Sequence, residues 1–222
     1  IKSFDQEELE KNKVVPASES SRRKIALVGN GPAVDNTEIR IVDPGTFGQI
    51  PAGGVGEIWV LSPSNAEGYW NREQETEETF NARLSDTGEG PFMRTGDLGF
   101  MDNGELYVTG RLKDLLIIRG VNYYPTDIEL TVERAHPSLC PNSGAVFAVD
   151  SDGQERLIIA QEVKRTCIRT LDVDEVVTAI REAVLEKHEI QVYAILFIKQ
   201  GGIPKTSSGK IQRRLCKKRY EA

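Results

Sequence analysis

The stretch GRLKDLLIIRG, residues 110–120, marks the point at which the pattern of the sequence changes. Before it, alternating apolar and polar residues separated by Gly, Pro and Asn turns predict short strands, as in a small twisted sheet or barrel. After it, helical apolar spacing alternates with buried strands, which is typical of a compact α+β domain. We therefore expect an α+β chain with a β-rich domain over residues 1–110 and an α+β domain over residues 111–222.

The composition is ordinary for a globular protein and excludes several classes of function. The chain has 222 residues, of which 39% are hydrophobic and 28% charged, and its net charge of -6 argues against binding to nucleic acid. Its apolar runs, such as residues 193–198, fall far short of the roughly 18 residues of a membrane span. Three cysteines without metal-ligand spacing indicate reduced thiols, so we expect a cytoplasmic protein. With only two histidines, we expect no histidine-based metal site.

Local patterns predict the individual elements. Strands are expected over residues 38–42, 57–61, 98–101, 105–108, 115–118, 145–149, 157–163 and 192–198, the last buried on both faces. Helix starts are indicated by the capping residues Asn71, Thr126 with Glu129, and Asp172. The last helix is expected over residues 210–219, and residues 1–24 are expected to form a surface segment or a connection.

Asp97 lies in FMRTGDLG, residues 92–99, at the junction of a loop and a strand. A carboxylate held between two glycine-flanked bends can accept hydrogen bonds from a vicinal diol, as on a ribose. The alternative is a turn aspartate that accepts hydrogen bonds from its own backbone. The sequence of this motif alone is compatible with both.

Within residues 110–120, three residue types suit a ligand site at a domain boundary. Arg111 can fork onto sugar or phosphate oxygens, Lys113 can act as the pivot, and Gly120 lets the backbone approach a ligand closely. Taken in isolation, alternating charges before a strand also fit a solvated segment.

Lys210 follows a hydroxyl-rich loop, PKTSSGK, residues 204–210. An ammonium placed there can face a phosphate or carboxylate whose negative charge grows in a transition state. The loop is not a phosphate-cradling P-loop, because Pro204 stands where that motif needs glycine and Ile211 where it needs Ser or Thr. A solvated loop that leads into a basic tail is the alternative interpretation.

Together, and in this order and spacing, the three stretches resemble the acyl-adenylate-forming enzymes, the superfamily of acyl-CoA synthetases, luciferases and nonribosomal adenylation domains. The resemblance covers essentially the whole chain. GEIWV at residues 56–60 and GYW at residues 68–70 match a further motif of the superfamily. Within it, the chain is most similar to the fatty acyl-AMP ligases over residues 4–16, 110–129, 171–175 and 203–213.

The resemblance implies a role for each candidate residue. Asp97 would bind the ribose hydroxyls of ATP or acyl-AMP, and Arg111 would contact ribose or phosphate. Lys113 would be the hinge about which a small mobile domain rotates. Lys210 would reach the fatty-acid carboxylate and the α-phosphate during adenylation. In the second conformation the loop of residues 120–124 would replace Lys210 and line the path of the pantetheine.

The implied reaction has two steps and needs a larger protein. A fatty acid attacks the α-phosphate of ATP, and the acyl-adenylate then passes its acyl group to the phosphopantetheine thiol of an acyl carrier protein. The superfamily's phosphate-binding loop and its Mg²⁺-binding glutamate are expected upstream of these residues. The chain would then be the end of the large adenylation domain, residues 1–110, plus the small domain, and would lack full activity alone.

Two other interpretations remain open. A long-chain acyl-CoA synthetase would use free coenzyme A as the acceptor in place of the carrier protein. A non-catalytic module would only dock a carrier protein, for which a basic tail is a candidate surface. That tail contains Lys210, Arg213, Arg214, Lys217, Lys218 and Arg219. A solvated helix face is the alternative for the same residues.

Overall fold

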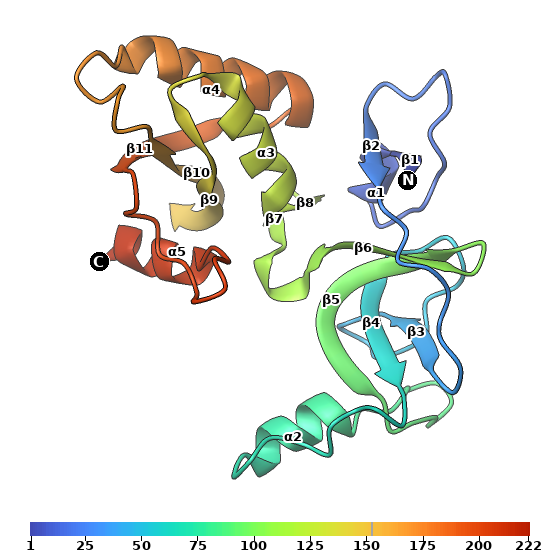
Figure 1. Cartoon of the computed structure of the whole chain (residues 1–222). Coiled ribbons are helices and arrows are strands. Elements are labelled where there is room, and N and C mark those ends of the chain that lie inside the picture. The colour runs from blue at the N-terminus through green and yellow to red at the C-terminus, as the bar shows by residue number, and fades with distance from the viewer. Residues whose placement is uncertain (152) are drawn as a thin grey trace. The chain divides into compact units, whose positions relative to one another are not determined.

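The computed structural model describes residues 1–151 and 153–222. The chain falls into two compact units, Ile1–Lys113 and Asp114–Ala222 (Figure 1). Helices and strands are mixed along its length, so the predicted α+β fold class is confirmed. In the described ranges, no helix is both long enough and apolar enough to cross a membrane.

The first unit is built on a four-stranded antiparallel sheet of order β3-β4-β5-β6. Its strands are β3 (Glu38–Val42), β4 (Gly56–Leu61), β5 (Met93–Asp102) and β6 (Glu105–Arg111). The sheet is open and is not closed into a barrel, so of the two predicted forms the sheet is the one observed. β5 and β6 are joined by Asn103 and Gly104, whose φ angles of +50° and +78° fit the tight hairpin turn that Asn-Gly favours.

The opening segment was predicted to be a surface segment or a connection, but part of it lies in the core of this unit. β1 (Lys2–Asp5) pairs with β2 (Lys24–Leu27), and Phe4 is fully buried. The Phe4 ring meets the rings of Phe100 and Tyr107 edge-on, with centroids 4.9 and 5.2 Å apart. An aromatic residue in a polar run therefore fixes this segment to the sheet.

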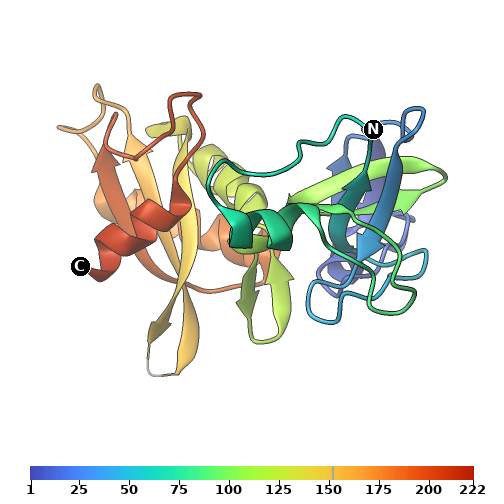
Figure 2. The same ribbon diagram turned by 90° about the horizontal axis from the view of Figure 1, so that it is seen from below.

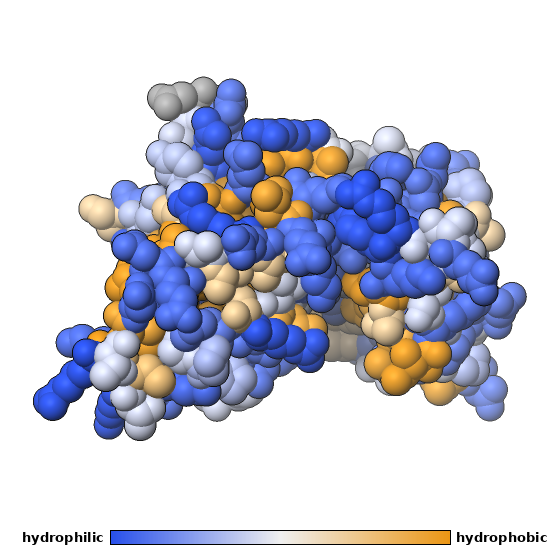
Figure 3. Space-filling view, turned by 90° about the horizontal axis from the view of Figure 1, so that it is seen from above, coloured by the Kyte–Doolittle hydropathy of each residue, from blue (hydrophilic) through white to orange (hydrophobic). Residues whose placement is uncertain are grey.

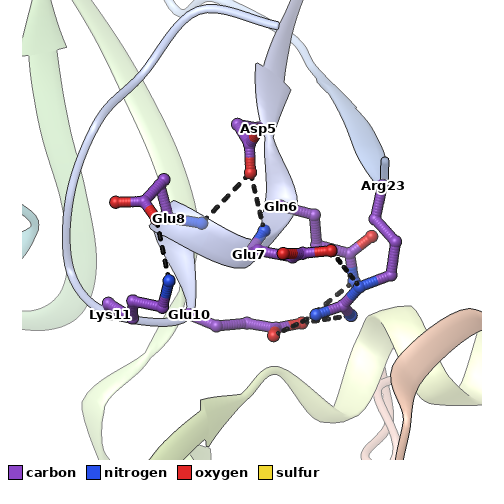
Figure 4. A network of polar contacts seen from close by, with 7 residues as sticks. All are labelled: Asp5, Gln6, Glu7, Glu8, Glu10, Lys11 and Arg23. Carbon is purple, nitrogen blue, oxygen red and sulfur yellow. Dashed lines mark hydrogen bonds and ion pairs between the residues drawn. The ribbon is translucent and has the colours of Figure 1, made fainter. Parts of the chain in front are cut away.

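Figure 4 shows the polar contacts that hold the segment after β1. The carboxylate of Asp5 caps the short helix α1 (Gln6–Leu9) by accepting hydrogen bonds from the backbone N–H groups of Glu7 and Glu8. Arg23 donates from both terminal nitrogens to Glu10, at 2.8 and 2.6 Å, and both side chains are nearly buried. This two-bond pair ties the end of α1 to the start of β2.

Helix α2 (Glu73–Phe80) begins later than predicted. Asn71 was expected as its N-cap, but this residue has a left-handed φ of +54°. The residue at the cap position is Arg72, without a side-chain capping bond. The hydroxyl of Thr76 accepts a hydrogen bond from the backbone N–H of Tyr69, which connects the helix to the preceding loop.

The described part of the second unit contains a three-stranded sheet of order β11-β10-β9, a short hairpin and three α-helices. The sheet comprises β9 (Leu139–Ser151), β10 (Gln154–Val163) and β11 (Val192–Lys199), and the hairpin comprises β7 (Leu116–Ile118) and β8 (Val121–Tyr123). The helices are α3 (Pro125–Ala135), α4 (Val173–His188) and α5 (Arg213–Glu221). β10 is antiparallel to β9 and parallel to β11.

The core of this unit has two layers, one on each face of the sheet. Successive residues of β10 alternate between the faces, so Ile159 packs with Ile128 of α3 and Ile180 of α4. Its neighbour Ile158 packs on the opposite face with Cys216 of α5. Figures 1 and 2 show α4 and α5 on opposite sides of the sheet.

Two local predictions in the second unit were wrong and one was confirmed. Asp172 caps α4 by accepting a bond from the backbone N–H of Glu175, as predicted. The capping box of Thr126 and Glu129 does not form, because α3 begins at Pro125 without a side-chain cap. β11 is an edge strand whose residues are mostly half-buried, so its predicted burial on both faces is not observed.

Apolar side chains also remain on the described surface. Exposed examples are Val28, Val34, Trp70, Ile117 and Tyr193. Figure 3 shows one face, on which polar side chains dominate and apolar ones form separate patches. Exposure of this kind is ordinary for folded proteins.

Candidate functional site

Asp97 lies on a bulge in β5. Glu57 of β4 pairs with Leu98, whereas Trp59 pairs with Arg94, so residues 95–97 stand opposite a single residue of β4. Extra residues bend a strand and re-aim its side chains, and Figure 1 shows β5 strongly curved. Gly96 in the bulge has a φ of +71°, which favours glycine at this position.

The structure brings Asp97 and Arg111 together. They are direct partners in the register of β5 and β6, and the Nε of Arg111 lies 3.2 Å from Oδ1 of Asp97. The side chains are 36% and 63% exposed, respectively. An ion pair this exposed contributes only about 0–1 kcal/mol, so a ligand can replace it at little cost. The backbone N–H of Asp97 donates to the hydroxyl of Thr95. The Asp97 carboxylate accepts from Arg111 and not from the backbone of its own turn, which was the alternative interpretation of this motif.

A buried carboxylate, which the sequence analysis missed, lies next to this bulge. Glu57 has a side chain only 2% exposed. It accepts hydrogen bonds from the Nε of Arg94 at 3.1 Å, from the indole N–H of Trp59 at 3.0 Å and from the backbone N–H of Gly96 at 3.2 Å. A glutamate inside the apolar motif GEIWV was the available signal, because buried charges need partners.

Lys113 and Gly120 lie on either side of the boundary between the units. Lys113 is in a short 3₁₀ helix (Leu112–Asp114) and is the last residue of the first unit. Gly120 and Arg119 form the turn between β7 and β8, with φ angles of +77° and +54°. Apart from Gly120 and its two chain neighbours, no heavy atom of the described residues lies within 4 Å of where a Cβ of Gly120 would stand, so this backbone is open to approach. Residues 121–123, expected in a loop, form β8.

Lys210 lies in a braced loop and not in a helix as predicted. α5 begins only at Arg213. The backbone N–H of Lys210 donates to the hydroxyl of Thr206, and the N–H of Thr206 donates back to the carbonyl of Lys210 at 2.8 Å. The loop closes at its base with a bond from the N–H of Gln212 to the carbonyl of Pro204. Lys210 itself is exposed, so the loop holds the backbone and leaves the ammonium to solvent.

A second buried glutamate anchors the end of this loop. Arg213 donates from Nε and one terminal nitrogen to both oxygens of Glu129, each at 2.7 Å, and from the other terminal nitrogen to Asp114 at 3.0 Å. Glu129 also accepts a bond from the backbone N–H of Val146. Burial raises the pKa of Glu129, against the opposing effect of Arg213. The network connects Asp114, the first residue of the second unit, with α3, β9 and α5.

The described residues contain no group of three or more His, Cys, Asp or Glu side chains that could hold a metal ion. Cys140, Cys167 and Cys216 are free cysteines. Burial raises the pKa of Cys140 and Cys216 above that of an ordinary thiol, so neither is an activated nucleophile.

Comparison with known sequences shows which proteins this chain resembles. A family model described as Disco-interacting protein 2-like, AMP domain, matches residues 113–222. JamA of Moorena producens, a medium-chain-fatty-acid–[acyl-carrier-protein] ligase, is 54% identical over 96% of this chain and 36% of its own length. FadD26 of Mycobacterium tuberculosis, a long-chain-fatty-acid–AMP ligase, is 36% identical over 99% of this chain and 38% of its own length. The chain thus spans little more than a third of these relatives.

Solved structures agree with the sequence relatives. A structure from a study of fatty acyl-adenylate ligases of E. coli and L. pneumophila matches 99% of this chain and 37% of its own, with a TM-score of 0.83 and 30% identity. McyG A-PCP complexed with phenylalanyl-adenylate matches 93% of this chain and 34% of its own, with a TM-score of 0.76 and 30% identity. Fold and relatives define a segment of an adenylate-forming enzyme. Within that class, this chain belongs to the fatty acyl-AMP ligase family, as its motifs predicted.

Proposed function

We propose that this chain is part of an ATP-dependent ligase that activates a fatty acid as acyl-adenylate and transfers it to the phosphopantetheine thiol of an acyl carrier protein. The observation that carries the proposal is the exposed Asp97–Arg111 pair on its braced bulge, in a chain of this family. JamA is named as a ligase to an acyl carrier protein, which supports the carrier as acceptor.

In this proposal the first unit is the end of the large adenylation domain and binds the ribose. Asp97 has one carboxylate oxygen on Arg111 and is partly exposed, which leaves acceptor capacity for the two hydroxyls of a ribose. Arg111 keeps its terminal nitrogens as donors for a ribose or phosphate oxygen. ATP, when bound, supplies the α-phosphorus that the fatty-acid carboxylate attacks. The residues described here fit the ribose end of that nucleotide.

Lys210 in the second unit is assigned to charge neutralisation. During adenylation a carboxylate oxygen forms a bond to the α-phosphorus, while the bond from that phosphorus to the pyrophosphate oxygen breaks. An exposed ammonium on a braced loop can stand against the fatty-acid carboxylate and the α-phosphate, where charge develops. The ligands of Mg²⁺ are assigned to residues outside this chain.

The second step needs a different arrangement of the two units. Lys113 is the assigned hinge, because it is the last residue of the first unit. Rotation of the small second unit about it would withdraw Lys210 and bring forward the hairpin that carries Gly120, along which the pantetheine would pass. Free cysteines fit a reducing compartment, so we place the enzyme in the cytoplasm.

A transfer assay tests this function in a protein of the relatives' length that contains the chain. The purified enzyme receives ATP, Mg²⁺ and a labelled fatty acid, with either holo-acyl carrier protein or coenzyme A. We expect acyl-AMP without an acceptor and labelled carrier protein with holo-carrier. Acyl-CoA as the main product would favour the acyl-CoA synthetase alternative. Absence of acyl-AMP with fatty acids of all lengths would favour the non-catalytic docking module.

A further inference from the structure

Glu57 is a buried charge for which the proposed reaction has no direct use. It lies in β4 with its side chain almost completely withdrawn from solvent, so it cannot touch a bound nucleotide. Burying a carboxylate is costly unless it is paired and hydrogen-bonded. The three donors that satisfy it come from β4 itself and from β5, the strand that carries Asp97.

The contact with Gly96 connects this carboxylate to the bulge. Gly96 lies in the stretch where β5 departs from the regular ladder. Its N–H donates instead to Oε1 of Glu57 at 3.2 Å. Gly96 immediately precedes Asp97, so the path of the backbone at Gly96 sets where the Asp97 side chain starts.

The other oxygen of Glu57 is held by two further side chains. Oε2 accepts bonds from the indole of Trp59 and from Arg94, whose terminal nitrogen lies 2.9 Å away. The guanidinium of Arg94 in turn lies over the ring of Phe47, 4.8 Å from its centroid. Indole, guanidinium and aromatic ring therefore leave the carboxylate little freedom to turn away from Gly96.

Thr95 provides a second brace on the same bulge. Its hydroxyl donates to the carbonyl of Ile58 in β4 at 2.7 Å and accepts from the backbone N–H of Asp97 at 3.1 Å. The two residues before Asp97 are thus both bonded to β4, one through Glu57 and one through Ile58. The backbone that carries the half-exposed Asp97 carboxylate cannot shift without breaking one of these bonds.

We propose that Glu57 is a positioning residue, which holds the β5 bulge through Gly96 so that Asp97 is presented to the ribose hydroxyls. This role rests on the proposed ribose contact of Asp97. Glu57 acts through the backbone of Asp97 and touches no substrate. Preorganisation of this kind strengthens ligand binding, because the site does not have to be ordered when the nucleotide arrives.

Glu57→Gln tests this role with little change of shape. An amide offers one oxygen and one NH₂, whereas all three partners of Glu57 are donors. In either orientation of the amide, a donor faces a donor, and either the bulge or Arg94 loses its acceptor. Glu57→Asp keeps the charge but is one methylene shorter, so it cannot reach Arg94 and Gly96 together.

The readout is discrimination between ATP and its 2′-deoxy and 3′-deoxy analogues in acyl-AMP formation by the protein of the relatives' length. Asp97→Ala provides the reference, and Glu38→Gln, which removes an exposed charge on β3, is the matched control. We expect Asp97→Ala and Glu57→Gln each to raise KM for ATP roughly tenfold and to flatten discrimination, with a smaller change in kcat. The double variant should be no worse than Asp97→Ala, because Glu57 acts through Asp97.

Each outcome decides between the role of Glu57 and that of Asp97. If Asp97→Ala lowers discrimination but Glu57→Gln behaves like Glu38→Gln, the positioning role of Glu57 is overturned. If Asp97→Ala itself leaves KM and discrimination unchanged, the ribose contact fails and the role of Glu57 fails with it. If Glu57→Gln does not fold, Glu57→Asp decides: unchanged discrimination overturns the role, and reduced discrimination in a stable protein supports it.

Discussion

Glu57 in the first unit and Glu129 in the second are two buried glutamates with similar kinds of partner. They differ in how far apart in the chain those partners lie. Each accepts bonds from an arginine and from one backbone N–H. Glu57 braces neighbouring strands of a single sheet. Glu129 is bonded to Arg213, 84 positions away in the chain.

The difference shows two ways of presenting a charged side chain. The backbone before Asp97 is held tightly, because Thr95 and Gly96 are both bonded to β4, whereas the Asp97 carboxylate meets Arg111 only in an exposed ion pair. Lys210 is held only through its backbone, and its anchor Arg213 lies three residues further on. A fixed carboxylate suits a ligand contact that persists, and a free ammonium on a fixed loop suits a residue that is brought in and withdrawn.

The largest effect on stability is expected from Arg213→Met. The change leaves Glu129 buried without its charged partner, which typically costs about 3–5 kcal/mol. Chemical denaturation of the chain, followed by a probe in the second unit, should show a free energy of unfolding lower by about that amount. Arg214→Met, next to it and exposed, is the control and should change stability by less than about 0.5 kcal/mol. Equal stabilities of the two variants would remove the anchoring role of Arg213.

Lys210→Ala should have the largest effect on the first chemical step. Loss of one charge aimed at the developing transition state typically costs roughly 10²–10³-fold in kcat. The measurement is the rate of acyl-AMP formation without an acceptor, in the protein of the relatives' length. Lys218→Ala, an exposed lysine on α5, is the control. A rate for Lys210→Ala within twofold of the control would refute the assigned role.

Trp59→Phe should weaken the first unit by roughly 2 kcal/mol, less than Arg213→Met weakens the second. The change removes the indole N–H that donates to Glu57 and leaves the remaining partners in place. Trp70→Phe is a matched control, because Trp70 is 90% exposed and should tolerate the change. Thermal unfolding of both variants gives the comparison, and similar melting temperatures would mean that the indole contributes little to the Glu57 network.

The smallest effect concerns Asp43, in the turn that leads to Phe47. The backbone N–H groups of Thr46 and Gly45 hold the pKa of Asp43 below its usual value. A carboxyl with a lowered folded-state pKa stabilises the protein above its unfolded pKa, and this contribution disappears as pH falls through the folded pKa. Asp43→Asn should therefore cost less than about 1 kcal/mol at neutral pH and nothing in strong acid. The measurement is the free energy of unfolding of the original protein and of Asp43→Asn at several pH values. A gap between the two proteins that grows as the pH falls would contradict this prediction.

The sequence predicted those parts of the fold that depend on local patterns. Asp172 caps its helix as expected, and the Asn103-Gly104 turn joins two strands as expected. A predicted helix cap is absent where its residue makes a tertiary contact instead. Glu129 was expected to reach back to its own helix start and instead binds Arg213. Phe4 was assigned to the surface because its neighbours are polar, yet it packs against rings from β5 and β6.

The same limit applies to the candidate site. The hairpin predicted over residues 98–101 and 105–108 includes neither Asp97 nor Arg111, whereas the observed strands β5 and β6 extend far enough to pair the two residues. The bulge before Asp97, with two extra residues, is not encoded in any local pattern. The sequence indicated Glu57 only as part of the family motif GEIWV, because a single glutamate in an apolar strand does not reveal its partners. Lys210 was expected in a helix, since the sequence does not show that Arg213 begins α5 while it is bonded to Glu129. The roles of Asp97, Arg111, Lys113, Gly120 and Lys210 remain predictions.

ATP–pyrophosphate exchange with a fatty acid tests the central claim most directly. It is measured with this chain alone and with a protein of the relatives' length that contains it. We predict exchange only in the longer protein, because the proposed ribose contact and Lys210 are part of the proposed site, and the phosphate-binding loop is expected upstream of these residues. Exchange by the chain alone would mean that the ATP site is misplaced, and no exchange in either, across fatty acids of all lengths, would contradict the assignment as an adenylating ligase.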